Sequence, residues 1–185
     1  MRRRSTFRSK DHEQPLSLED QEERGRTIIL RQLAMVDRSR AQLQRKLNER
    51  GISDEVAANL LDHFEDLGLV DDHHFAEVFV RTRFAEKTLS KAQLRRELAQ
   101  AGVDGDIAEE AVAAISDDDE FDAAVTFAAK KLMQSSGKPD TLEKRTWMAL
   151  ARRGFSSSTA SAAIRHAHEL LSHDTSEDDI SAELL

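Results

Sequence analysis

Cysteine is absent from the 185 residues of the chain, which excludes disulfide bonds, thiolate zinc sites and cysteine nucleophiles. This absence is typical of proteins in a reducing compartment, and we expect the protein to be cytoplasmic. No apolar run approaches the roughly 18 residues that a membrane-spanning helix needs, so we expect no membrane partner. The basic N-terminal segment is not followed by the apolar run of a secretory signal.

Helix breakers and aromatic residues are also scarce. The chain has 2 prolines, 7 glycines and no tyrosine, and aromatic residues make up 5% of it. Its apolar residues are mainly leucine and alanine, which favour helices together with glutamate, arginine and glutamine. Hydrophobic residues make up 39% of the chain and charged residues 34%. So small an apolar fraction predicts an elongated structure with a thin core.

Negative charge is concentrated in two segments. The formal net charge is −8, but five carboxylates lie in residues 117–122 and six in residues 169–185. Without these segments the charge of the chain is +3, so a mildly basic body ends in an acidic tail. The first 15 residues carry five basic side chains that could contact phosphates, although a solvated, disordered arm is the simpler interpretation.

Capping residues divide the sequence into nine helical segments, each beginning at a residue that favours a helix N-terminus. The predicted helices begin at Ser17, Ser39, Ser53, Asp71 or Asp72, Ser90, Asp104, the acidic run at Asp117, the break at Pro139, and Ser156 or Ser157. Glycines at 51, 68, 102 and 154 end four of them. We expect the first helix to reach about Val36 and the last to end near Leu171.

The helical pattern repeats itself along the chain. A shift of 51 residues places Ser39 on Ser90, Leu43 on Leu94, Leu47 on Leu98 and Gly51 on Gly102. A further shift of 52 residues places Leu98 on Leu150 and Gly102 on Gly154. This third copy is weaker, because Trp147 lies one position away from the expected apolar site at Thr146. Caps, glycines and apolar positions align together, which chance periodicity does not explain.

The repeat predicts an all-α fold of three tandem three-helix repeats that form an elongated, curved helical rod. Three helices of this size bury little by themselves, so neighbouring repeats are expected to stack. We expect a disordered basic arm in residues 1–16 and an acidic flexible tail in residues 173–185. The three repeats are expected in residues 17–68, 69–116 and 117–172.

Candidate catalytic and metal-binding residues do not form a consistent set. His73 and His74 are adjacent, and adjacent helical residues point about 100° apart, so they cannot hold one ion from a single face. Residues 156–158 look like a serine cap rather than a nucleophile, and Gly137-Lys138 lacks the other residues of a phosphate-binding loop. The acidic run lacks the spacing of an EF-hand loop. The sequence therefore predicts no enzyme, with no catalytic residue, no cofactor and no metal.

Basic residues recur on the second helix of each repeat and on the long helix that begins the second repeat. If the repeats stack in register, these side chains form a basic strip that faces phosphates or an acidic protein surface. Ordinary solvated helix faces are an equally good interpretation. The candidate residues for contacting a partner or DNA are Arg45, Lys46, Arg81, Arg83, Lys91, Arg95, Arg96, Lys144, Arg145, Arg152 and Arg153.

Residues 67–76 are the predicted junction between the first and second repeats. Gly68 is expected to end one helix, and Asp71 and Asp72 to cap the next. We expect Phe75 and Phe79 to pack across the joint. Loss of the Asp72 cap is expected to cost about 1 kcal/mol.

Several segments together resemble the RecX family of regulators. Residues 67–76, LGLVDDHHFA, resemble the family segment Gly-Leu/Tyr-Leu/Ile/Val-Asp-Asp-x-x-Phe-Ala. Residues 38–47, RSRAQLQRKL, are similar to a second RecX segment, with Gln42 in place of the usual acid. Residues 94–98 and 152–155 look like the matching parts of later repeats, so that the resemblance covers about residues 25–170.

The resemblance implies an all-helical protein of three three-helix units that regulates the RecA recombinase. Members of the family bind the RecA filament on single-stranded DNA and restrain its recombinase, ATPase and co-protease activities in DNA repair and the SOS response. We therefore expect a monomeric negative regulator whose partner is the RecA filament, with single- or double-stranded DNA as a second partner. The long basic arm and the acidic tail depart from the family pattern.

Two other functions also fit the residues. Helix pairs such as 39–50 and 53–67 resemble helix-turn-helix units, which would make the protein a reader of duplex DNA. However, residues 53–67 and 104–116 are acidic or apolar and lack the side chains that read bases. The third interpretation is a helical-repeat scaffold for another partner, and binding to the RecA filament would separate it from the first.

Overall fold

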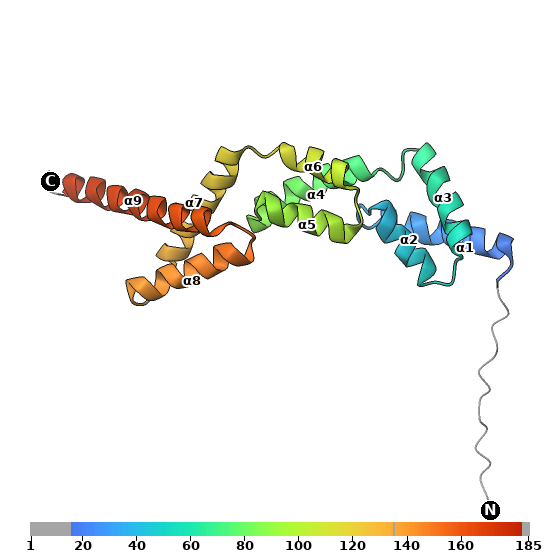
Figure 1. Ribbon diagram of the computed structural model, residues 1–185, viewed down its shortest axis with the longest axis horizontal. Coiled ribbons are helices and arrows are strands. Elements are labelled where there is room, and N and C mark those ends of the chain that lie inside the picture. The colour runs from blue at the N-terminus through green and yellow to red at the C-terminus, as the bar shows by residue number, and fades with distance from the viewer. Residues whose placement is uncertain (1–15, 135, 183–185) are drawn as a thin grey trace, which may run out of the picture. The chain divides into compact units, whose positions relative to one another are not determined.

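The computed structural model describes the backbone of residues 16–134 and 136–182, and the side chains in these ranges up to residue 172. All the regular secondary structure in these ranges is helical, which confirms the predicted all-α fold. The helices are α1 (Leu18–Leu33), α2 (Arg40–Asn48), α3 (Asp54–Asp66), α4 (Asp72–Lys87), α5 (Lys91–Ala101), α6 (Gly105–Ala113), α7 (Asp117–Met133), α8 (Pro139–Arg152) and α9 (Ser157–Ala182), shown in Figure 1. None of the described helices is long and apolar enough to cross a membrane.

Polar side chains cap most of the helices where the sequence predicts a cap. A side-chain oxygen accepts a first-turn N–H group at Ser17, Ser53, Asp71, Ser90 and Asp104. The first four N–H groups of a helix have no partner within the helix, so each such bond is worth about 1 kcal/mol. Helix α7 begins after Ser116, which forms a capping box with Asp119 inside the acidic run.

The burial pattern confirms the threefold repeat. Corresponding leucines at 47, 98 and 150 are each 0% exposed. The corresponding glycines at 51, 102 and 154 have φ angles of 81°, 83° and 90°. Leu43, Leu94 and Thr146 are 1%, 0% and 1% exposed, so Thr146 takes the place of a core leucine in the third copy. The register is therefore kept, and Trp147 packs beside the core as an addition to the repeat.

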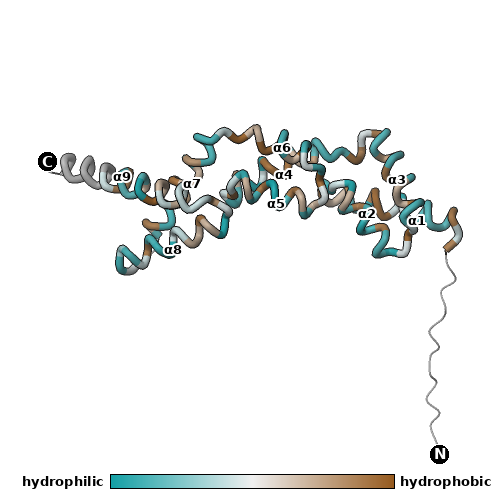
Figure 2. Tube along the Cα trace, in the orientation of Figure 1, coloured by the Kyte–Doolittle hydropathy of each residue, from teal (hydrophilic) through white to brown (hydrophobic). Residues whose placement is uncertain are grey.

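The described residues divide into two compact units, and the first of them, unit 1, consists of residues up to 38 and residues 42–70. Its helices α1, α2 and α3 enclose a core that includes Ile29, Leu47 and Phe64. Helix α1 lies so close to α3 that a Cβ atom on Gly25 would overlap the side chain of Leu60. In Figure 2, apolar and polar residues are interspersed along α1, α2 and α3, as expected for amphipathic helices with one buried face.

The second unit, unit 2, contains residues 39–41 and all described residues from 71 onward. It has two cores. Helices α4, α5 and α6 enclose one that includes Phe75, Leu94 and Val112, and α7, α8 and α9 enclose one that includes Leu132, Leu150 and Ile164. Each core is thus built by one three-helix repeat.

Two helix ends differ from the prediction. Val36, where we predict the first helix to end, lies beyond α1, which ends at Leu33, and is 51% exposed. The last helix continues to Ala182, through ten residues that we assign from the sequence to a flexible tail. No glycine or proline follows Gly154, so the sequence contains no strong stop signal for this helix.

Candidate functional site

A groove lined by basic residues lies between α4, α7 and α8 in unit 2, and we call it the basic groove. Its volume is about 670 Å³. Its basic side chains are Lys87, Lys130, Lys131, Arg152 and Arg153. Glu86 is the one carboxylate among the described residues that line it. Five cations and one anion around a groove favour an anionic ligand.

Helix α4 ends at the groove in an unusual backbone conformation. Thr88, its C-cap, has a φ of 51°, the left-handed region that non-glycine residues rarely adopt. Its N–H group donates to the carbonyl of Phe84 and closes the last turn. This turn places Lys87 at the groove, where the backbone carbonyl of Lys87 is available to a neighbouring helix.

Arg153 uses that carbonyl and joins α8 to α4 and α7. Its Nε atom donates to the Lys87 carbonyl at 3.0 Å, and its Nη1 atom donates to the Ala149 carbonyl at 3.4 Å. The guanidinium carbon lies 3.9 Å from the centroid of the Phe127 ring, a cation–π contact. Burial and, next, repulsion from Arg152 lower the pKa of Arg153 from its ordinary value, yet an arginine stays charged at neutral pH.

Three other cations of the basic groove stand at helix ends and face solvent. Lys130 and Lys131 lie in the last turn of α7, and Arg152 lies in the last turn of α8; all three are exposed. Cations are favoured there because the last carbonyls of a helix carry partial negative charge. Arg153 is therefore a structural cation, whereas these three make no side-chain bond to other described residues and can reach a ligand.

The predicted basic strip divides into paired and unpaired residues. Lys46 pairs with Glu49, Arg83 with Glu97, Lys91 with Asp117 and Arg95 with Glu109. Arg45 also has an interaction within the protein. Among the described residues we find no ion pair for Arg81, Arg96, Lys144, Arg145 or Arg152, all of which are exposed. Four of the eleven strip residues are thus held by carboxylates of their own chain.

The paired carboxylates are shifted towards their charged form. A hydrogen bond from Arg95 is the largest cause of the lowered pKa of Glu109, and a bond from Lys91 has the same effect on the pKa of Asp117. A bond from Lys46 lowers the pKa of Glu49. These acids stay ionised at neutral pH, and their basic partners are less available to bind another anion.

Several residues of the strip lie apart from the basic groove. Arg81 lines a different groove, and Lys144 lies beside Trp147 on α8. Arg96 lies at the close approach of α5 to Gly154. From the predicted strip, the structure brings together only Arg152 and Arg153 in the basic groove.

Lys130 and Lys131 are basic-groove residues that sequence reasoning missed. They lie on the first helix of the third repeat, outside the pattern of basic residues on the second helices. Lys87 lies at the end of the long helix that begins the second repeat, and it lines a groove with α7 and α8. Two adjacent lysines in the last turn of a helix are the sequence signal that could have indicated these residues. Their proximity to α4 is visible only in the tertiary structure.

Gly68 and Asp71 have the predicted roles at the junction, whereas Asp72 makes its bond at the start of another helix. Gly68 has a φ of 66°, and Asp71 is the N-cap of α4. The carboxylate of Asp72 instead accepts the N–H of Arg40 at 2.8 Å, so it serves the start of α2. Phe75 is buried in the core of the second repeat, where its ring packs against that of Phe79 with the two centroids 5.7 Å apart.

The histidines make isolated contacts with single carboxylates. His73 lies 3.5 Å from Glu110, and His168 lies 3.0 Å from Glu143. Within the described residues there is no group of three or more histidines and acids that could hold a metal ion.

Comparisons with known proteins assign the chain to a family. Models of the first, second and third three-helix domains of RecX match residues 26–64, 71–112 and 117–164. The chain is 40% identical over 148 residues to Regulatory protein RecX of Thermobifida fusca (strain YX), covering 80% of each chain. It is 34% identical over 157 residues to Regulatory protein RecX of Streptomyces coelicolor (strain ATCC BAA-471 / A3(2) / M145), covering 84% of each.

Solved structures show the same fold. The crystal structure of RecX from Lactobacillus salivarius has a TM-score of 0.69 and 24% identity, covering 81% of this chain and 98% of that chain. A second crystal structure of a regulatory protein RecX has a TM-score of 0.68 and 23% identity, covering 80% of this chain and 73% of that one. The helices and their repeated burial pattern define an all-helical protein of three tandem three-helix repeats. The chain belongs to the RecX family of regulatory proteins.

Proposed function

We propose that this protein is a negative regulator of the RecA recombinase. It binds the RecA filament on single-stranded DNA and restrains the recombinase, ATPase and co-protease activities of that filament. It acts by binding, without chemistry of its own. Membership of a family of regulatory proteins supports this proposal, since the family name refers to regulation.

The basic groove is the observation that carries the proposal. A filament on DNA presents phosphates, and exposed lysines and arginines bind phosphates largely through charge. Lys130, Lys131 and Arg152 are exposed and converge from two helices, so they can neutralise neighbouring phosphates or acidic side chains of a filament. Four more exposed strip residues have no ion pair among the described residues and are further candidate contacts: Arg81, Arg96, Lys144 and Arg145.

Direct reading of duplex DNA is less well supported. A recognition helix needs arginine, asparagine or glutamine side chains that reach base edges. Helix α6 carries Asp106, Glu109 and Glu110 instead, and Arg95 is held by Glu109. Such a helix would meet the phosphates of a duplex with like charge.

The test is single-strand-dependent ATP hydrolysis by RecA, measured with co-sedimentation of the protein on filaments. We expect sub-stoichiometric protein to lower hydrolysis and to sediment with the filament. Unchanged hydrolysis together with no co-sedimentation would contradict the proposal. Tight, sequence-selective binding to duplex DNA in a salt titration would favour the helix-turn-helix interpretation.

A variant with a neutralised basic groove tests whether this groove, rather than another part of the surface, binds the filament. The variant Lys130→Gln, Lys131→Gln, Arg152→Gln should lose most of its inhibition while keeping its helical circular dichroism. The matched control Arg24→Gln, Arg31→Gln, Arg165→Gln removes three exposed cations elsewhere and should inhibit normally. Equal losses in both variants would show that net charge, and not the basic groove, sets the affinity.

A further inference from the structure

A second groove lies between α4, α6 and the beginning of α7 in unit 2. Its volume is about 580 Å³. Val80, Ala111 and Ile115 form part of its floor and belong to the core of the second repeat. Phe84 and Ile107 are half-buried beside them. The groove therefore opens onto apolar core surface. Covering this floor with apolar groups removes it from water, which lowers the free energy of a complex.

The rim of this groove is acidic, and we call it the acidic-rimmed groove. Its carboxylates come from Glu77, Glu110, Asp119 and Asp122. Arg81 and His73 are the basic groups in its lining, and the His73 side chain lies 3.5 Å from Glu110. The rim therefore keeps a net negative charge in either protonation state of the histidine.

Two alanines keep the groove wide. Ala85 of α4 and Ala114 at the end of α6 are both exposed in its wall, where larger side chains would fill it. The space is large enough for several leucine-sized side chains. Hydrophobic grooves between helices are sites that receive the apolar face of another helix.

We propose that the acidic-rimmed groove docks a basic amphipathic helix of a partner protein. Apolar side chains spaced along one helix face would cover the floor, and flanking lysines or arginines would pair with the carboxylates of the rim. Charge complementarity excludes nucleic acid as the occupant, because phosphates would face these carboxylates. The inference does not rest on RecA regulation, since it concerns a different surface with the opposite charge.

The basic arm of the chain itself fits this groove less well. Residues 1–15 contain five lysines and arginines but only two apolar residues of the kind needed, Met1 and Phe7. These two are six positions apart, which does not match the spacing of three, four or seven residues along one helix face. A partner helix can supply the several apolar anchors that the floor requires.

The experiment uses a defined probe and the full chain. The probe is a fluorescein-labelled peptide of about 18 residues with leucines on one helical face and lysines elsewhere. Fluorescence anisotropy measures its binding. One comparison peptide has glutamate in place of every lysine, and another has the same composition in an order that breaks the apolar face. We expect the lysine peptide to bind and both comparison peptides to bind at least about tenfold more weakly.

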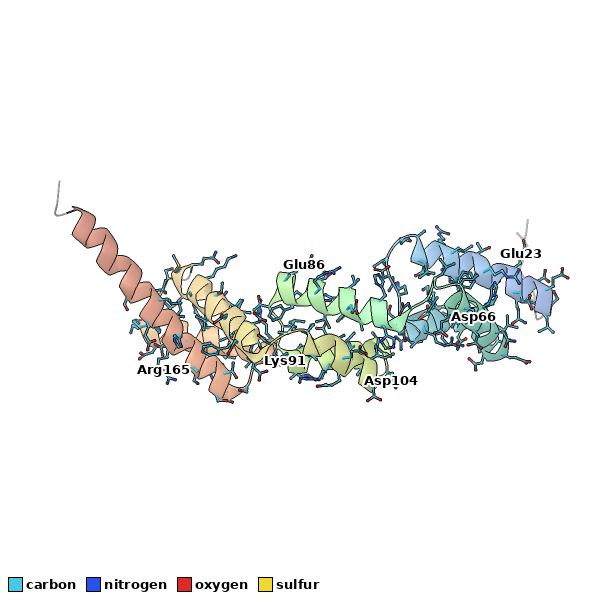
Figure 3. The ribbon with its side chains drawn as sticks, turned by 90° about the horizontal axis from the view of Figure 1, so that it is seen from above. Glu23, Asp66, Glu86, Lys91, Asp104 and Arg165 are labelled. Atoms are coloured by element: carbon cyan, nitrogen blue, oxygen red, sulfur yellow. The ribbon has the colours of Figure 1, made fainter. Side chains whose placement is uncertain are left out.

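Variants of the groove locate the binding. Glu77→Lys with Asp122→Lys should weaken the lysine peptide about tenfold or more, because attraction becomes repulsion. Ala114→Trp should weaken it by filling the groove. The control Glu23→Lys with Asp66→Lys makes the same change in charge at exposed sites of unit 1, labelled in Figure 3, and should bind as well as the parent.

Four outcomes would overturn the proposal. The first is equal binding of the lysine and glutamate peptides, and the second is unchanged binding by both groove variants. The third is a several-fold rise in affinity when residues 1–15 are removed, which would make the arm the occupant. Unchanged affinity without the arm supports a partner helix. A protein dimer that dissociates on Ala114→Trp would assign the groove to a second copy of the chain and would also overturn the proposal.

Discussion

Gly154 is a residue whose missing side chain allows two repeats to approach each other. Its φ of 90° lies in the region that favours glycine, and a Cβ atom there would lie 2.6 Å from Ser90 Oγ and 2.7 Å from Gln93 Cβ. Gly51 has a similar φ of 81° but no atom within 4 Å of a Cβ. The two glycines therefore separate the cost of the backbone conformation from the cost of close packing.

We predict that Gly154→Ala destabilises the protein more than Gly51→Ala. The Gly51 change should cost about 1 kcal/mol, the strain of alanine in a left-handed conformation. The Gly154 change should cost about 1–3 kcal/mol more, because the overlap forces α5 and α8 apart. Urea unfolding followed by circular dichroism measures both. Equal costs would show that unit 2 adapts to the extra methyl group without strain.

Asp71 and Asp72 make their bonds at the starts of different helices. Asp71 accepts the N–H of His74, and Asp72 accepts the N–H of Arg40. We predict that Asp71→Ala and Asp72→Ala each cost about 1 kcal/mol in the free energy of unfolding. Asp66→Ala, an exposed site in the last turn of α3, is the control and should cost less than about 0.5 kcal/mol. A neutral Asp72→Ala change would mean that water replaces the carboxylate at Arg40.

Helices α5 and α6 are joined by an exposed ion pair as well as by their core. Arg95 Nη2 donates to Glu109 Oε1 at 2.7 Å, and this pair lowers the pKa of Glu109 and raises that of Arg95. The unfolded chain therefore binds more protons at Glu109 than the folded protein does in mildly acidic solution. The pair stabilises the folded protein above the unfolded pKa of Glu109, and this contribution is lost as pH falls through the folded pKa.

We predict a pH-dependent difference between the parent protein and Glu109→Gln. The parent should be slightly more stable at pH 7, and the two should become equal as the pH falls below the lowered pKa of Glu109. The effect is small because the pair is exposed and screened by salt. Urea midpoints between pH 7 and pH 3 measure it, with Glu23→Gln at an exposed site of α1 as the control. A constant difference over this range would contradict a role for the charged pair.

At the scale of the whole molecule, the chain separates its charges. The basic groove and the acidic-rimmed groove both use Phe84 and Ala85 of α4, so one helix separates a surface for anions from one for cations. Further acidic side chains are concentrated near the C-terminus, where residues 173–185 contain five carboxylates. Their field opposes the approach of any polyanion.

We predict that removing residues 173–185 increases the rate of association with a RecA filament on single-stranded DNA. The net charge changes from −8 to −3, which reduces long-range repulsion. The gain should be several-fold at low salt and should vanish near 1 M salt, where charges are screened beyond about 3 Å. Stopped-flow fluorescence measures the rate. A gain that persists in high salt would instead indicate a direct contact that covers the binding surface.

Local signals predict the helices and the repeat better than they predict the grooves. Caps such as Ser53 and Ser90, and glycines such as Gly102, act within a few residues and can be identified in the sequence. The basic groove combines Lys87 with Lys130, which lie on different repeats, so its position depends on how α4 meets α7. The pairing of Lys91 with Asp117 likewise spans 26 residues.

The bond between Ser90 and Arg153 makes one amide proton a reporter of repeat docking. The Ser90 N–H donates to the Arg153 carbonyl at 3.0 Å, and Ser90 is 1% exposed. This N–H precedes α5, so local fraying of that helix neither makes nor breaks its bond. Its hydrogen exchange with solvent requires the third repeat to separate from the second. The protection factor of this proton should therefore give the free energy of docking between the two repeats.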